Sequence, residues 1–170
     1  MLNKLSQITT FIFDVDGVLT DGSVFVTEAG DQCRTFNTRD GYAIQLAVKC
    51  GYNVCVITGG KSDGVRHRLN SLGVTDVYLG AHTKIDLFKA YITDKAIDTT
   101  GILYMGDDIP DIDIMKQVAL PTCPADAAEE VKAVAKYISP ALGGRGCVRD
   151  VIEKVLKIQG KWMNTNAMSI

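Results

Sequence analysis

Short apolar runs alternate with helical patterns along most of this chain. Apolar and β-branched residues predict strands at 10–15, 54–58, 77–79 and 102–105, each ended by small or polar residues. Between and after these runs, apolar residues recur at helical spacing, at Ile44 and Val48, at Val65, Leu69 and Leu72, at Ile85, Phe88 and Ile92, and at Val148, Val151, Ile152, Val155 and Leu156. Strand followed by helix, repeated, predicts an α/β fold with a doubly wound, mostly parallel sheet and helices on both faces.

One stretch interrupts this alternation. Residues 23–26 and 32–36 predict two short strands around a turn at 28–31, which indicates a β-hairpin after the first strand. The hairpin segment, residues 21–37, is long enough for a flap or a subunit contact but too short for a separate cap domain. We therefore expect a single domain over residues 1–170, ending in a tail at 160–170 that has no apolar periodicity.

Composition narrows the function classes. The apolar fraction of 46% and the charged fraction of 22% are typical of a globular protein. A net charge of −2 without a basic tract gives no electrostatic reason to expect nucleic acid or an anionic membrane as a partner. No apolar stretch reaches the ~18 residues of a membrane span. The five cysteines show no CxxC spacing, which favours free, mostly buried thiols and a cytoplasmic location.

A pair of carboxylates follows the first predicted strand. Asp14 and Asp16 are two residues apart, so their side chains point into one space where the strand ends. Two adjacent carboxylates repel each other unless a cation or a proton lies between them. The carboxyl ends of parallel strands are also where α/β proteins bind ligands. The pair favours a metal and a reaction in which one Asp is a nucleophile and the other a proton carrier, although such a pair can also cap a turn.

Polar residues end the other predicted strands in the same way. Thr58 ends the second predicted strand, and Lys84 lies where the helix after the third begins. A cation at a helix N-terminus opposes the helix dipole, and a bound anion would offset that cost. Asp108 and Asp111 fit the N-cap and third position of a helix and need no further explanation. Asp107 has no such structural reason.

These motifs together resemble a known family. Residues 14–17 (DVDG), 58–59 (TG), Lys84 and 106–111 (GDDIPD) occur in the order of the four motifs of haloacid dehalogenase superfamily phosphatases. Residues 14–22, 39–41, 65–68 and 143–146 resemble the small capless branch that dephosphorylates 3-deoxy-octulosonate and nonulosonate phosphates. The nearest type is the 3-deoxy-D-manno-octulosonate 8-phosphate phosphatases of lipopolysaccharide sugar synthesis. The resemblance covers residues 8–158 and implies a Rossmann-like fold without a cap.

The resemblance also implies roles for the acidic residues. Asp14 would attack phosphorus and form an aspartyl-phosphate, and Asp16 would protonate the leaving alkoxide and then take a proton from water. Mg²⁺ would be bound by the Asp14 carboxylate, the Asp16 backbone carbonyl and Asp107. Asp108 and Asp111 would support this site from behind.

Phosphate and substrate binding would fall to other residues. Thr58, the Gly59 backbone N–H and Lys84 would bind the phosphoryl oxygens. The substrate carboxylate calls for an arginine, and the substrate candidates are Arg68, Arg145, Arg149 and Gly60. In the family the residue after Thr-Gly is often charged and helps select the sugar, and Gly60 departs from this pattern. The resemblance implies an eight-carbon sugar acid as the first choice and a nine-carbon one as the alternative.

Capless enzymes of this branch assemble as homotetramers. The resemblance therefore implies that the hairpin packs between subunits, with Val24, Phe25, Val26 and Phe36 at the interface. The alternative is that these residues pack on their own domain. Three other functions compete with the phosphatase: a receiver-type phospho-acceptor domain, a non-catalytic regulatory subunit and a phosphomutase.

Overall fold

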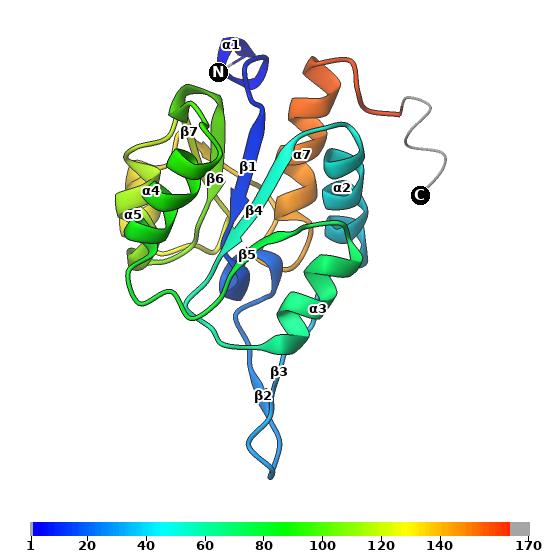
Figure 1. Ribbon diagram of the computed structural model, residues 1–170, viewed down its shortest axis with the longest axis vertical. Helices are drawn as coiled ribbons and strands as arrows, with labels where there is room; N and C mark the ends of the chain where they lie inside the picture. Colours follow the sequence, from blue (N-terminus) through cyan, green and yellow to red (C-terminus); the bar gives the residue numbers. More distant parts are fainter. Residues whose placement is uncertain (1, 164–170) are drawn as a thin grey trace.

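Six parallel strands form the central sheet of the computed structural model, which describes residues 2–163 (Figure 1). Their order is β5-β4-β1-β6-β7-β8, so β1 lies inside the sheet between β4 and β6. The strands are β1 (Thr10–Phe13), β4 (Asn53–Ile57), β5 (Asp76–Tyr78), β6 (Ile102–Met105), β7 (Leu120–Cys123) and β8 (Tyr137–Ile138). This arrangement confirms the predicted fold class.

Helices cover both faces of the sheet. One face carries α1 (Leu2–Leu5), α2 (Thr38–Lys49), α3 (Asp63–Ser71) and α7 (Cys147–Ile158), and the other carries α4 (Lys84–Asp94), α5 (Ile112–Met115) and α6 (Glu129–Val134) (Figure 1). Side chains of β1 alternate accordingly: Phe11 and Phe13 enter the first core, and Ile12 enters the second. The apolar stripe of α7 is buried as predicted.

Strand limits differ from the prediction where the chain turns. The strand predicted over 10–15 ends at Phe13, because the Asp14 carboxylate accepts a hydrogen bond from the Val15 N–H and starts a wide, irregular helical turn, η1 (Val15–Leu19). This turn is broken at Gly17, whose φ of 82° favours glycine. Strands β4 and β5 each begin and end one residue before the predicted range, and β6 matches it.

Sequence reasoning missed the far side of the sheet. Strand β7 contains Pro121, which lacks an N–H and argues against a strand inside a sheet. Strand β8 has only two residues, too few to show alternation. Both strands are held by parallel pairing to a neighbour, a long-range interaction that no local pattern reveals.

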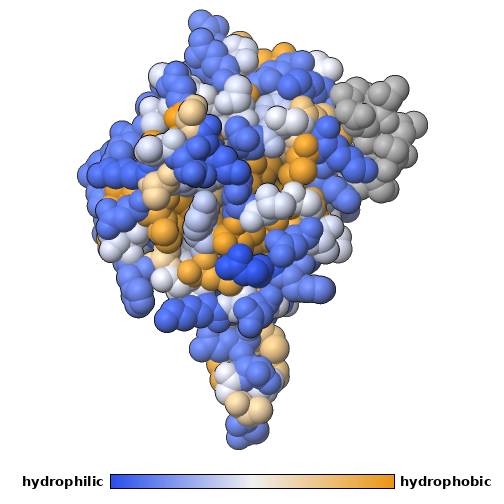
Figure 2. Space-filling view, viewed as in Figure 1, coloured by the Kyte–Doolittle hydropathy of each residue, from blue (hydrophilic) through white to orange (hydrophobic). Residues whose placement is uncertain are grey.

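The predicted hairpin is present but its strands are shorter. Antiparallel β2 (Phe25–Val26) and β3 (Gln32–Cys33) project from the body of the molecule (Figure 1). Exposed fractions are 39% for Val24, 70% for Phe25 and 59% for Val26, and Figure 2 shows hydrophobic patches on this projection. Phe36 differs from these three, because it packs against the core of its own chain.

The remaining expectations concern the tail, the cysteines and membrane spans. The tail predicted over 160–170 is described only as far as Met163, and residues 164–170 lie outside the described part. All five cysteines are free, and Cys55, Cys123 and Cys147 are buried as predicted. Within residues 2–163, no helix is both long and apolar enough to cross a bilayer.

Candidate active site

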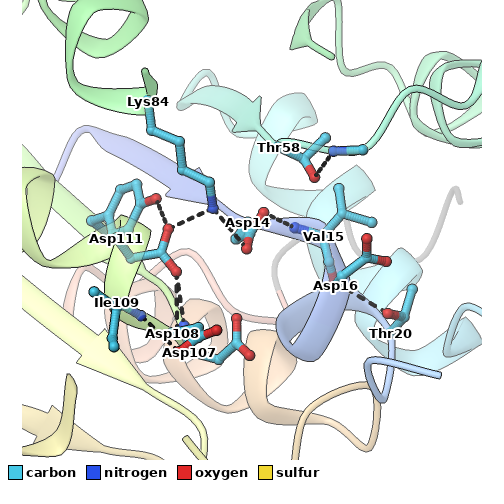
Figure 3. A network of polar contacts seen from close by, with 12 residues as sticks. Asp14, Val15, Asp16, Thr20, Thr58, Lys84, Asp107, Asp108, Ile109 and Asp111 are labelled. Carbon is cyan, nitrogen blue, oxygen red and sulfur yellow. Dashed lines mark hydrogen bonds and ion pairs between the residues drawn. The ribbon is translucent and has the colours of Figure 1, made fainter. Parts of the chain in front are cut away.

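Residues from four predicted strand ends meet at the carboxyl edge of the sheet (Figure 3). Asp14 follows β1, Thr58 follows β4 and Asp107 follows shortly after β6, while Lys84 is the first residue of α4. Parallel strands bring these positions to one edge, so the convergence follows from the topology. The structure therefore gathers the four positions on which the sequence argument depends.

Lys84 lies between two carboxylates. Its Nζ atom is 2.8 Å from Asp14 Oδ2 and 2.7 Å from Asp111 Oδ1, and the residue is only 9% exposed. Burial by itself lowers the pKa of Lys84, but Asp14 and Asp111 outweigh it and raise the pKa above its usual value. Lys84 is thus held as a cation at the start of α4.

Asp111 has all its acceptor positions in use. Its Oδ1 atom accepts hydrogen bonds from Lys84 and from the Tyr104 hydroxyl at 2.6 Å, and its Oδ2 atom accepts from the backbone N–H groups of Asp107 and Asp108. Asp108 caps the short helix that begins at Ile109, as predicted. Asp111 therefore positions Lys84 and the Asp107 loop, and has no lone pair to spare for a metal.

Asp14 and Asp107 form an electrostatically strained pair. Burial, with a contribution from Asp111, raises the pKa of Asp14 to about 6 against the opposing effect of Lys84. Burial and the nearby Asp14 and Asp111 raise the pKa of Asp107 to about 7. Asp107 Oδ1 is buried without a hydrogen-bond partner. Oxygens of Asp14, Asp107 and Asp111 lie within 4.8 Å of one another. An oxygen-binding cation such as Mg²⁺ fits this vacant acceptor and charge excess.

Glycines let the loops approach each other. A Cβ atom on Gly17 would lie 2.0 Å from Asp107 Oδ2, and one on Gly143 would lie 2.0 Å from the Gly17 carbonyl oxygen. The Asp14 loop is therefore pressed between the Asp107 side chain and the glycine-rich segment at 143–146. The structure thus places residues 143–146 directly against the Asp14 loop.

Thr58 and the glycines after it border the same site. The Thr58 residue is 3% exposed, and its Oγ1 atom accepts a hydrogen bond of 3.3 Å from the Gly60 N–H. This bond uses a lone pair of the Thr58 hydroxyl, so the hydroxyl hydrogen remains available to donate to an anion. This geometry suits binding of a phosphoryl oxygen.

Asp16 is paired with a residue that sequence reasoning missed. Arg34, just after β3, places Nε 2.7 Å from Asp16 Oδ1 and Nη2 3.1 Å from Asp16 Oδ2. Nothing in the sequence pattern marks Arg34, because the contact depends on how the hairpin folds back. Tyr104 was missed for a similar reason, since it occupies an ordinary position in the apolar run of β6.

The four substrate candidates lie in two places. Gly60 and Arg68 line a groove of about 980 Å³ between the hairpin and α3. Arg145 and Arg149 line a separate cavity of about 440 Å³ that runs along α7 as far as Lys157. Arg145 pairs weakly with Asp21 at 3.5 Å, and its side chain is 68% exposed. Arg149 pairs with Glu153 and lies over the rings of Tyr42 and Trp162.

Asp40, from the motif at residues 39–41, connects α2 to α7. Its buried carboxylate accepts hydrogen bonds from the backbone N–H groups of Gly146 at 3.2 Å and Arg149 at 2.7 Å. It therefore caps the N-terminus of α7 from another helix. Sequence reasoning noted the motif but not this contact.

The chain is similar to known phosphatases in sequence and in fold. A 3-deoxy-D-manno-octulosonate 8-phosphate phosphatase of Escherichia coli (strain K12) is 36% identical over 170 residues, covering 100% of this chain and 90% of that protein. The Yersinia pestis enzyme of the same name has a crystal structure that matches with a TM-score of 0.92 and 33% identity, over 94% of this chain and 86% of that one.

A third relative was solved with ligands. The 3-deoxy-D-manno-octulosonate 8-phosphate phosphatase from Moraxella catarrhalis, in complex with a magnesium ion, a phosphate ion and a KDO molecule, matches with a TM-score of 0.91 and 30% identity. The match covers 95% of this chain and 92% of that one. No protein-family model matches the chain.

Proposed function

Because the chain belongs to the 3-deoxy-D-manno-octulosonate 8-phosphate phosphatase family of the haloacid dehalogenase superfamily, we propose that it removes phosphate from a 3-deoxy-2-keto sugar acid phosphate. The observation that supports this most directly is the meeting of Asp14, Thr58, Lys84 and Asp107 at one edge of the sheet. These groups provide a nucleophile, a hydroxyl donor, a buried cation and an unpartnered carboxylate, which together suit phosphoryl transfer.

Asp14 is proposed as the nucleophile. Its Oδ1 atom is fixed by the Val15 N–H at 2.7 Å, and its Oδ2 atom by Lys84. One carboxylate oxygen forms a bond to phosphorus while the bond from phosphorus to the sugar oxygen breaks, which leaves an aspartyl-phosphate and a sugar alkoxide. Asp16 donates a proton to that alkoxide and then accepts one from the water that attacks the aspartyl-phosphate, so inorganic phosphate leaves and both residues are restored.

Thr58, the Gly59 N–H and Lys84 are proposed to bind the phosphoryl oxygens. Lys84 is held from behind by Asp111, whose carboxylate is itself fixed by the Tyr104 hydroxyl. A cation fixed before the substrate arrives stabilises developing negative charge without reorganising.

Asp14, the Asp16 backbone carbonyl and Asp107 are proposed to hold Mg²⁺. Mg²⁺ held there would neutralise charge on the phosphoryl group and would allow Asp14 and Asp107 to be ionised together. The unpartnered Asp107 Oδ1 and the raised pKa values of both carboxyl groups support this assignment.

The proposed substrate is 3-deoxy-D-manno-octulosonate 8-phosphate, because relatives that match 100% and 95% of the chain carry that activity in their names. Its product enters lipopolysaccharide sugar synthesis. A nonulosonate 9-phosphate is the alternative, since Gly60 contributes no side chain to distinguish the two sugar acids. We also propose that residues 1–170 form a single domain in which residues 21–37 act as a flap.

The assay is Mg²⁺-dependent release of phosphate from a panel of sugar phosphates, with Asp14→Asn as the inactive variant. Asp113→Asn is the matched control, because Asp113 is an exposed carboxylate on α5. Turnover of the eight-carbon substrate well above the nine-carbon one supports the assignment. Release that survives Asp14→Asn contradicts the mechanism, and no release from any phosphomonoester contradicts the function.

We also propose that the chain forms a homotetramer in the cytoplasm. Val24, Phe25 and Val26 on the projecting hairpin give an exposed apolar surface suited to a second copy of the chain. Phe36 is left out of that surface because it packs on its own core. Five free cysteines are compatible with a reducing compartment.

A further inference from the structure

The hairpin brings one arginine, whose side chain is largely covered, to the edge of the proposed active site. The Arg34 side chain is only 5% exposed, although its neighbours Gln32 and Cys33 on β3 are exposed. Its guanidinium binds Asp16 through two parallel hydrogen bonds, at 2.7 and 3.1 Å. Such a two-point pair fixes the plane and direction of the guanidinium.

Gly60 leaves the space in which this guanidinium lies. A Cβ atom at position 60 would be 3.2 Å from Arg34 Nη2 and 3.4 Å from Asp16 Oδ2. Gly60 has no positive φ, so its backbone does not require glycine. A side chain at position 60 would therefore press on Arg34 and require its guanidinium to shift by a few tenths of an ångström.

Arg34 still has hydrogen-bond capacity toward the groove. A guanidinium carries five N–H groups, of which the bonds to Asp16 and to the Gln32 carbonyl use three and leave two. Nη1 and Nη2 carry the remaining two, so they lie on the terminal edge of the guanidinium, which matches a carboxylate. Arg34 also lines the groove of about 980 Å³ shared by the hairpin and α3.

The position of Asp16 indicates which part of a substrate this edge meets. Asp16 is proposed to serve the leaving sugar oxygen, so a cation bound to Asp16 lies on the sugar side of the reacting phosphorus. Lys84 occupies the phosphoryl side, next to Asp14. We propose that Arg34 is a specificity-determining residue that binds the carboxylate of the sugar acid. One Asp16 oxygen keeps its hydrogen bond to the guanidinium, and the other is released to serve the leaving sugar oxygen.

This inference rests on the proposed phosphatase function, and its test separates the two. Arg34→Gln and Arg34→Lys are compared with wild type on two substrates, the eight-carbon sugar acid phosphate and a sugar phosphate that has no carboxylate. We expect Arg34→Gln to lower the ratio of the two kcat/KM values by roughly tenfold or more, mainly through KM for the sugar acid, because a charge-assisted pair is lost. Arg34→Lys keeps the charge without the two-pronged geometry and should recover part of the ratio.

Binding of the phosphate-free sugar acid gives a second readout. Its inhibition constant should rise with Arg34→Gln by a factor similar to the change in KM. Lys116→Gln is the control, since it removes one exposed positive charge away from the groove. Circular dichroism shows whether each variant is folded. If Arg34→Gln does not fold, the comparison is made with Arg34→Lys instead.

The outcomes are distinct. Equal loss on both substrates, or an unchanged inhibition constant for the sugar acid, overturns the assignment of Arg34 and leaves the phosphatase function standing. A wild-type protein that hydrolyses neither substrate overturns the proposed function itself. A larger loss on the substrate with a carboxylate than on the one without, partly restored by lysine, is the result that supports Arg34.

Discussion

Replacing Asp107 by Asn should remove activity and at the same time stabilise the metal-free protein. The two effects have one cause, because Asp107 is placed where a carboxylate is unfavourable unless a cation joins it. Its Oδ1 atom is buried without a partner, and the Asp14 and Asp111 carboxylates lie nearby. Burial and these neighbours raise the pKa of Asp107 from 3.8 to about 7.

The size of the stabilisation follows from this pKa. At about 1.36 kcal/mol per pH unit, moving the pKa from 3.8 to about 7 costs the folded state about 4 kcal/mol once Asp107 is ionised. Because the residue is partly exposed, solvent screening reduces this to about 2 kcal/mol. For a chain of this length, that corresponds to a rise in Tm of roughly 4–8 °C for the metal-free variant at pH 8.

The sign depends on pH in a definite way. The folded pKa of Asp107 lies above the unfolded one, so the folded state binds the extra proton between about pH 4 and pH 7. Stability contributed by that proton is present below the unfolded pKa and is lost as pH rises through the folded pKa. The advantage of Asp107→Asn over wild type should therefore be largest at pH 8 and disappear toward pH 4.

Thermal and urea unfolding with EDTA, at pH 8 and at pH 5, measure this advantage, and the same scans with Mg²⁺ complete the test. Mg²⁺ should raise the Tm of wild type and leave that of Asp107→Asn nearly unchanged. Asp113→Asn, at an exposed position, is the control and should shift neither scan. The reasoning is refuted if metal-free Asp107→Asn is less stable than wild type at pH 8, or if Mg²⁺ stabilises both proteins equally.

Three other expectations concern the support of Lys84, proton release and assembly. Tyr104→Phe removes the 2.6 Å hydrogen bond to Asp111 and should lower the free energy of unfolding by about 1.5–3 kcal/mol and reduce kcat. Tyr52→Phe is the control, because it also loses one hydroxyl hydrogen bond of 2.6 Å but should leave kcat unchanged. Unchanged kcat in the Tyr104 variant would show that Lys84 needs no support from behind. Mg²⁺ should bind more tightly at pH 8 than at pH 6 and release protons on binding, because the pKa values of its proposed ligands Asp14 and Asp107 are about 6 and about 7. Calorimetry in buffers of different ionisation enthalpy measures the released protons, and a Mg²⁺ affinity that does not depend on pH would contradict the expectation. Phe25→Glu, at a side chain 70% exposed in the single chain, should dissociate the tetramer in sedimentation experiments without changing the Tm of the monomer, and a tetramer that persists would exclude the hairpin as its interface.

The helix that begins after Asp107 shows how far local rules reach. Asp108 as N-cap and Asp111 three residues later are a local pattern, and the structure has the capping box that this pattern predicts. The same sequence could not reveal that the Asp111 carboxylate also binds Lys84 and Tyr104. Those contacts join residues 27 and 7 positions apart, across elements that meet only in the folded sheet.

The sequence alone therefore determined the features that depend on neighbours along the chain. These include the alternation of strands and helices, the apolar stripe of α7, and the placement of polar residues at strand ends, because periodicity and capping act over a few residues. Parallel pairing then made the convergence of those strand ends predictable in outline.

Tertiary structure decided what fills the space between those ends. The pairing of Arg34 with Asp16, the cap that Asp40 gives to α7 and the vacant acceptor on Asp107 each depend on distances between segments far apart in sequence. Such distances are set by how the hairpin folds back and how closely glycine loops approach, which packing of the whole chain fixes and no local pattern encodes.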